Sequence, residues 1–164
     1  MITESSDWKP WTGLSKRNAL IVGDEPLLKR CMSAQLRRMN FNVESAGNYV
    51  AATQHLASHE FHVACVNVQL PCRSGYDLCD HIRRSPKLIG IPILMMGAHG
   101  SPVERAFAED AGANAFLQMP FSMGRFNQCV ESLLGMSRPK ARAMREVRPL
   151  AWMTIFDCAR HVTA

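Results

Sequence analysis

Residues 19–26 of the chain read ALIVGDEP, an apolar run that ends in an acidic turn and a proline. An unbroken apolar run of this length is typical of a strand that is buried on both faces of a sheet. Pro26 suits the first turn of a helix. The apolar residues that follow recur every three or four positions, on one helical face: Leu28, Met32, Leu36 and Met39. The segment therefore predicts a strand followed directly by a helix.

The same alternation of strand and helix continues to residue 135. Further strands are predicted at residues 43–46, 62–66, 91–96 and 115–117. Further helices are predicted at residues 48–58, 76–84, 101–111 and 123–135. Asn48 and Ser101 stand where helix caps are expected, and Gly112 stands where a helix ends. Alternation of this kind predicts an α/β fold, with a five-stranded parallel sheet and helices on both of its faces.

The composition places the chain among globular proteins. It has 164 residues, of which 47% are hydrophobic and 20% charged, and this favours one domain with additional tails. No apolar run reaches the length of a membrane helix, and the first residues lack the pattern of a signal peptide. We therefore expect a cytoplasmic protein that does not bind membranes. Its six cysteines, which form no Cys-x-x-Cys pair, are then expected to be reduced.

The net charge of +5 is unevenly distributed along the chain. The predicted domain, residues 18–135, has ten basic and ten acidic residues, so it has no basic excess that would attract nucleic acid. An N-terminal arm, residues 1–17, precedes it. A C-terminal extension, residues 136–164, has a net charge of +4 and five large apolar side chains within residues 150–156. We expect this extension to pack on the domain or on a second copy of the chain.

In parallel sheets of this kind the functional crevice lies outside the carboxyl ends of the strands. The candidate residues follow four of the predicted strands: Gly23-Asp24-Glu25, Asn67, Gly97-Ala98 and Met119-Pro120.

These positions and their flanks resemble the receiver domain of two-component response regulators, over about residues 18–135. The matching segments are LIVGDEP at 20–26, VNVQLP at 66–71 with Gly75 after it, IPILMMGA at 91–98, AGA at 111–113 and FLQMPF at 116–121. The resemblance implies a flavodoxin-like (βα)5 fold and a role in signalling.

The resemblance also assigns phosphoryl chemistry to certain positions, and most of them differ here. In the family, position 67 is the phosphorylated aspartate, positions 23 and 24 are acidic and help hold Mg²⁺, position 97 is Ser or Thr, and position 119 is Lys. This sequence has Gly23, Asp24, Asn67, Gly97 and Met119. An amide is a poor nucleophile, and one carboxylate is a weak ligand set for Mg²⁺. We therefore expect a degenerate phosphoacceptor pocket, with no catalytic residue, no cofactor and at most weak metal binding at Asp24.

Phe116 stands at the position of the family's switch aromatic, which turns inward on activation. Since position 97 has no hydroxyl to move, we expect the ring simply to be packed. The family's usual partner surface consists of the fourth helix, fifth strand and fifth helix, here residues 101–111, 115–117 and 123–135. We predict protein partners on this surface, with a homodimer among the options.

The sequence as a whole predicts a pseudo-receiver that is not an enzyme and acts through protein–protein contacts. Two alternatives stay open. The first is a receiver with a non-standard input, such as a bound metabolite or oxidation of Cys72. The second is a nucleic-acid-associated regulator that uses its basic C-terminal extension.

Two other groups of residues invite a functional interpretation. His55 and His59 are four residues apart on a predicted helix, with His62 nearby, and this spacing suits a shared metal. Only Glu60 offers a further ligand, so surface histidines are the better interpretation.

Four of the six cysteines invite an interpretation, in two pairs. Cys72 and Cys79 flank the predicted pocket, where a redox role would require an exposed thiol with a lowered pKa. Cys65 and Cys129 lie in apolar patterns and are predicted core residues.

Overall fold

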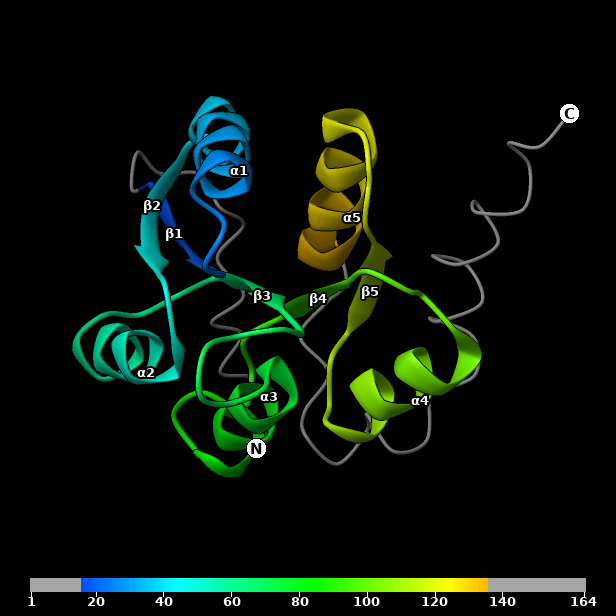
Figure 1. The fold of residues 1–164 in the computed structure, drawn as a ribbon. Helices are drawn as coiled ribbons and strands as arrows, with labels where there is room; N and C mark the ends of the chain where they lie inside the picture. Colours follow the sequence, from blue (N-terminus) through cyan, green and yellow to red (C-terminus); the bar gives the residue numbers. More distant parts are fainter. Residues whose placement is uncertain (1–15, 136–164) are drawn as a thin grey trace, which may run out of the picture.

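A five-stranded parallel sheet has the strand order β2-β1-β3-β4-β5 and carries helices on both faces (Figure 1). The computed structural model describes residues 16–135. The strands are β1 Arg17–Val22, β2 Phe41–Ala46, β3 Val63–Asn67, β4 Ile93–Gly97 and β5 Ala115–Gln118. The helices are α1 Pro26–Arg38, α2 Tyr49–Ser58, α3 Gly75–Arg84, α4 Pro102–Asp110 and α5 Met123–Gly135. The predicted fold class is confirmed. Residues 1–15 of the arm lie outside the described residues, as does the extension, whose packing was predicted. Arg17, which was assigned to the arm, is the first residue of β1.

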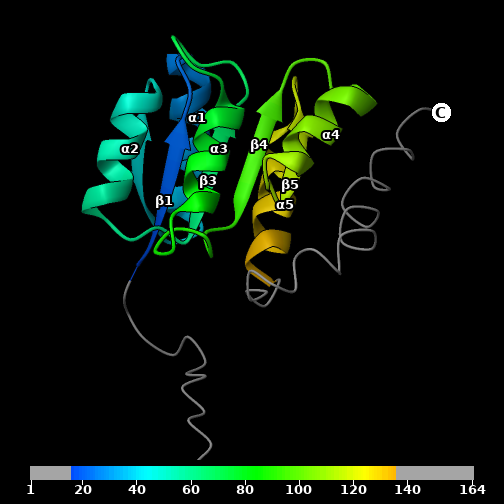
Figure 2. The same cartoon turned by 90° about the horizontal axis from the view of Figure 1, so that it is seen from below.

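Successive residues of each strand point to opposite faces of the sheet, and this divides the core into two clusters. Ala19 and Ile21 of β1 pack with α1 and α5 on one face. Leu20 and Val22 pack with α2, α3 and α4 on the other. Figure 1 shows the two layers of helices above and below the strands, and Figure 2 views the molecule from the side of α2, α3 and α4. Because both faces are covered, the central strands carry apolar residues on both faces, which explains the unbroken apolar runs in the sequence.

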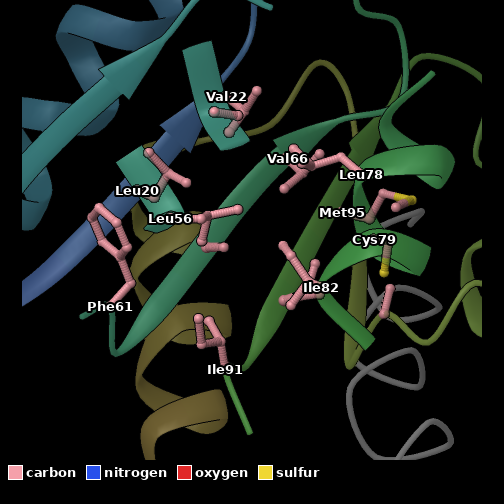
Figure 3. Close-up of a cluster of buried hydrophobic side chains, with 14 of the residues drawn as sticks. Leu20, Val22, Leu56, Phe61, Val66, Leu78, Cys79, Ile82, Ile91 and Met95 are labelled. Carbon is pink, nitrogen blue, oxygen red and sulfur yellow. The ribbon is translucent and has the colours of Figure 1, made fainter. Parts of the chain in front are cut away.

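The cluster under α2 and α3 shows how the helices are held on the sheet (Figure 3). Leu56 of α2 and Leu78 and Ile82 of α3 are buried in the same cluster as Val66 of β3 and Met95 of β4. Burying a side chain of this size contributes roughly 1.5–3 kcal/mol. The apolar faces of the helices therefore account for their position on the sheet.

The helix caps agree with the sequence, with one addition. Asn48 Oδ1 accepts a hydrogen bond from Ala51 N at 2.8 Å, and Ser101 Oγ accepts one from Glu104 N at 3.1 Å, so both predicted caps are confirmed. The cap of α3 was not predicted. Ser74 and Asp77 form a reciprocal capping box there, which starts the helix at Gly75 rather than at residue 76.

Four strands have different starts from those predicted. β1 begins at Arg17 rather than at residue 19, and β3 begins at Val63 rather than at residue 62. β2 begins at Phe41 rather than at residue 43, and the guanidinium of Arg17, the first residue of β1, stacks 4.8 Å from the centre of the Phe41 ring. β4 begins at Ile93 rather than at residue 91. Ile91 N donates to the Leu88 carbonyl in a turn, and Pro92 has no N–H to give to a neighbouring strand.

Arg83 of α3 joins three separate parts of the backbone. Its Nε donates to the Gly112 carbonyl at 2.7 Å. One terminal nitrogen donates to the carbonyls of Ile89 and Ile91 at 2.9 and 2.8 Å. The other donates to Asn114 Oδ1 at 2.6 Å. The four acceptors are neutral oxygens, and burial lowers the pKa of the guanidinium. Arg83 therefore connects α3 to the approach to β4 and to the turn before β5.

Candidate functional site

Gly23 and Asn67 lie side by side at the carboxyl ends of the central strands β1 and β3. Asn67 is 7% exposed and is the one polar side chain buried within residues 16–135. Its Oδ1 accepts a hydrogen bond from Gln69 N at 3.1 Å. A Cβ added at Gly23 would lie 3.6 Å from Asn67 Cβ, which is ordinary van der Waals contact. The sheet therefore brings these two predicted positions together, with room for a Cβ at position 23.

Asp24 is the one acidic residue among the five predicted positions, and it is exposed. The N-cap residue of α1 is Glu25, and no side-chain hydrogen bond caps this helix. Asp24 is therefore a solvated carboxylate and not a helix cap. The carboxyl ends of β1, β3 and β4, where the predicted positions lie, are called the corner below. Positions 23, 24 and 67 of this corner offer one carboxylate and one amide whose oxygen already accepts a hydrogen bond.

Gly75 closes the loop after β3 on the same corner. Its N–H donates to the Val68 carbonyl at 2.7 Å. A Cβ added at Gly75 would overlap the carbonyl of Asn67, so the backbone tolerates no side chain there. The close approach explains the glycine at this position and fixes the backbone around Asn67.

Gly97, at the end of β4, leaves space that two other side chains fill. A Cβ added there would lie 2.7 Å from Phe116 Cζ and 2.8 Å from Glu104 Oε1. Phe116 is 3% exposed, as expected for a packed ring. Glu104 Oε2 accepts a hydrogen bond from Gly100 N at 2.7 Å, which holds its carboxylate over the β4–α4 loop. Glu104 could not be singled out from the sequence, because its position depends on the path of this loop.

Met119 completes the predicted positions through its backbone. Its N–H donates to the Gly97 carbonyl at 2.8 Å, and the Met119–Pro120 peptide bond is cis. The thioether has no charge with which to neutralise a phosphoryl group. The structure thus groups positions 23 and 67 on one side of the corner and positions 97, 116 and 119 on the other.

These donors do not fit the divalent cation that receiver domains use. Mg²⁺ prefers octahedral oxygen ligands, chiefly carboxylates and water. Here position 23 has no side chain, and the Asn67 oxygen is engaged by Gln69. Within residues 16–135, no group of three or more His, Cys, Asp or Glu side chains is placed to hold a metal ion.

The histidines of the predicted cluster have separate surroundings. His55 Nδ1 lies 3.9 Å from Glu44 Oε2, and the His55 and His59 ring centroids are 6.3 Å apart. His62 Nδ1 instead accepts a hydrogen bond from Asn18 N at 3.1 Å. His62 therefore fixes the start of β1 relative to β3.

The cysteines need one correction. Cys79 does not flank the pocket: it lies in the core cluster of Figure 3, and burial raises the pKa of its thiol to about 12. A thiol with so high a pKa stays protonated and unreactive. Cys72 is exposed and has a positive φ of 68°. Cys65 and Cys129 are buried, as predicted.

Adding a methyl group at Gly97 tests the packing of Phe116. Gly97→Ala should lower the free energy of unfolding by about 2 kcal/mol, since a buried ring must move to admit the new Cβ. Gly23→Ala is the matched control, because the Cβ there makes ordinary contact. It should leave stability unchanged or raise it by up to ~1 kcal/mol. Urea unfolding of both variants measures the difference, and equal stabilities would contradict this account of position 97.

The comparisons with known proteins agree with this geometry. The sequence model of the response regulator receiver domain matches residues 19–131. The chain is 35% identical over 129 residues to the response regulator protein PilR of Pseudomonas aeruginosa, covering 78% of the chain and 28% of PilR. It is 30% identical over 118 residues to the transcriptional regulatory protein GltR of the same organism, covering 72% of the chain and 49% of GltR. The chain thus spans half or less of the length of these relatives.

Solved structures show the same fold. The chemotaxis response regulator CheY4 of Vibrio cholerae matches with a TM-score of 0.70 at 22% identity, over 73% of this chain and 100% of that one. A putative response regulator from Chloroflexus aurantiacus matches with a TM-score of 0.70 at 28% identity, over 73% of this chain and 98% of that one. Since the family match covers more than half of the chain, the protein belongs to the response regulator receiver domain family of two-component signalling.

Proposed function

We propose that this receiver domain works without phosphorylation of an aspartate and transmits its signal through contacts with other proteins. It is then a pseudo-receiver and not an enzyme, and it acts in the cytoplasm. Within residues 16–135 no helix is long and apolar enough to cross a membrane.

Asn67 is the observation on which the proposal depends. Receiver chemistry requires a carboxylate oxygen that attacks phosphorus and forms an acyl phosphate. Asn67 holds a neutral amide at that position, and an amide oxygen is a much weaker nucleophile. The absence of the metal-binding carboxylates and of a lysine at position 119 agrees with this assignment. Without the carboxylates of a metal site, a lysine at position 119 would lack its partners, and Met119 avoids an unpaired cation.

The packing of Phe116 supports a partner surface that needs no phosphoryl signal. In an active receiver the aromatic at this position moves together with the hydroxyl residue of β4. Here Gly97 has no hydroxyl, and the Phe116 ring fills the space that its side chain would occupy. The proposed partner surface, which consists of α4, β5 and α5, then keeps one conformation whatever the state of the corner at Asn67.

The proposal is tested by offering the protein the reagents to which receivers respond. Acetyl phosphate or beryllofluoride, each with Mg²⁺, should leave the NMR signals of residues 24, 67 and 116 unchanged. A saturable shift at millimolar Mg²⁺ or below would show that the corner still binds the cation. A covalent phosphoryl adduct detected by mass spectrometry would overturn the proposal directly.

A further inference from the structure

Helix α4 carries its large apolar side chains on the outside of the domain. Val103 is 63% exposed and Phe107 is 59% exposed. They are four residues apart, so they are neighbours on one face of the helix. The only buried residue of α4 is Ala108. The helix thus packs on the sheet through a small side chain and leaves its two bulky apolar side chains uncovered.

The apolar face continues onto α3. The Phe107 ring lies 6.2 Å from the Tyr76 ring, and Tyr76 Oη donates to the Glu104 carbonyl at 3.4 Å. The other large apolar side chains exposed within residues 16–135, Leu27 and Val50, stand singly on α1 and α2. Single exposed apolar residues are common, whereas a contiguous apolar patch marks a contact surface. The outer face of α4, defined by Val103, Phe107 and the Tyr76 ring, is such a patch.

The last turn of α4 is negatively charged. Glu109 and Asp110 are its final two residues, and no basic residue lies in this turn. A segment that covers the outer face of α4 is therefore favoured if it combines apolar side chains with positive charge.

Residues 136–164 have this composition and follow α5 directly. α5 starts after the carboxyl end of β5 and runs back toward the amino ends of the strands (Figure 2). α4 also ends on that side of the sheet, because β5 begins after it. Residues 136–149 carry five basic residues and one acidic residue, and residues 150–156 read LAWMTIF. The first 14 residues can extend up to ~45 Å, whereas α4, with its 9 residues, is ~13 Å long. The chain length is therefore ample.

We propose that residues 150–156 dock on the outer face of α4 in the same chain, while the basic residues 136–149 lie against its acidic end. This contact covers part of the proposed partner surface, so a partner must displace the segment before it binds α4. The competition with a partner depends on the function proposed above. The docking does not, and it is tested on the protein alone.

The test uses the full-length chain with Trp8 and Trp11 replaced by phenylalanine, which leaves Trp152 as the only tryptophan. In this background we expect blue-shifted Trp152 emission and weak quenching by acrylamide. Val103→Asp should shift the emission to longer wavelength and increase the quenching, because it places a charge in the apolar patch. Amide exchange of residues 150–156 should accelerate by at least about tenfold in the same variant.

Val50→Asp is the matched control. Val50 is 61% exposed and is the second residue of α2, as Val103 is the second residue of α4. This control should leave the Trp152 emission unchanged, with both variants keeping the far-ultraviolet circular dichroism of the parent.

Three results would overturn the proposal. In the first, Trp152 in the parent emits as it does in urea, so the segment is undocked. In the second, both substitutions change the emission equally. In the third, the emission depends on protein concentration and light scattering gives the mass of a dimer, so the segment docks on a second copy. A response to beryllofluoride would instead contradict the proposed function, so the two failures are distinguishable.

Discussion

Replacing Arg83 with methionine is expected to lower the free energy of unfolding by about 3 kcal/mol, because four hydrogen bonds are lost at once. Asn114 Oδ1 keeps its second donor, Ile93 N, at 2.8 Å. Methionine keeps most of the apolar stem but donates nothing to the Gly112, Ile89 and Ile91 carbonyls. Buried acceptors without a donor cost more than the hydrogen bonds themselves contribute. Urea unfolding followed by circular dichroism measures the loss.

The neighbouring arginine is the matched control. Arg84 lies next to Arg83 on α3, but its side chain is 80% exposed and pairs with Asp80 at 2.9 Å on the surface. Exposed ion pairs of this kind contribute about 0.3–0.5 kcal/mol. Arg84→Met should therefore have a small effect. If the two variants unfold at the same urea concentration, the connections made by Arg83 do not stabilise the fold.

Restoring the acidic corner is expected to produce the largest change in ligand binding. The triple variant Gly23→Asp, Asn67→Asp and Met119→Lys should bind Mg²⁺ at least about tenfold more tightly than the parent, since it adds two carboxylates beside Asp24. A Cβ at position 23 makes only ordinary contact with Asn67. Asn67→Asp alone should do little, because it lacks the second acidic partner and the cation. Calorimetric titration with Mg²⁺ measures all three proteins.

A carboxylate placed elsewhere controls for added charge. Gly90 lies before β4, on the side of the sheet where the strands begin, and a Cβ there would meet no atom within 4 Å. Gly90→Asp should leave Mg²⁺ binding as it is in the parent. Strong binding or phosphorylation of the single variant Asn67→Asp would show that Asp24 and the backbone are sufficient, and the account of this corner would then be wrong.

Patterns in the sequence that depend on near neighbours predicted most of the fold. The apolar run before Gly23 and the helical stripe after Pro26 correctly predicted β1 and α1, because burial on two faces and burial on one face leave different periods. The Asn48 and Ser101 caps were predictable since each bonds within one helical turn. The start of β4 was missed, because the turn that holds Ile91 back from the sheet depends on hydrogen bonds beyond its own strand.

The location of the candidate site was also predictable, since parallel strands bring Gly23, Asn67 and Gly97 to the same edge of the sheet. The chemistry that is possible at these strand ends depends on contacts between segments that are distant in the sequence. Phe116 fills the space above Gly97 only because β5 pairs with β4. Arg83 looks like an ordinary helix-surface residue until its 29-residue separation from Gly112 is closed by the fold. The sequence by itself determined the elements and the edge where they converge, through interactions within a turn or a strand. Only the tertiary structure decided which side chains occupy that edge and which face of α4 stays uncovered, because those contacts form after the elements have packed.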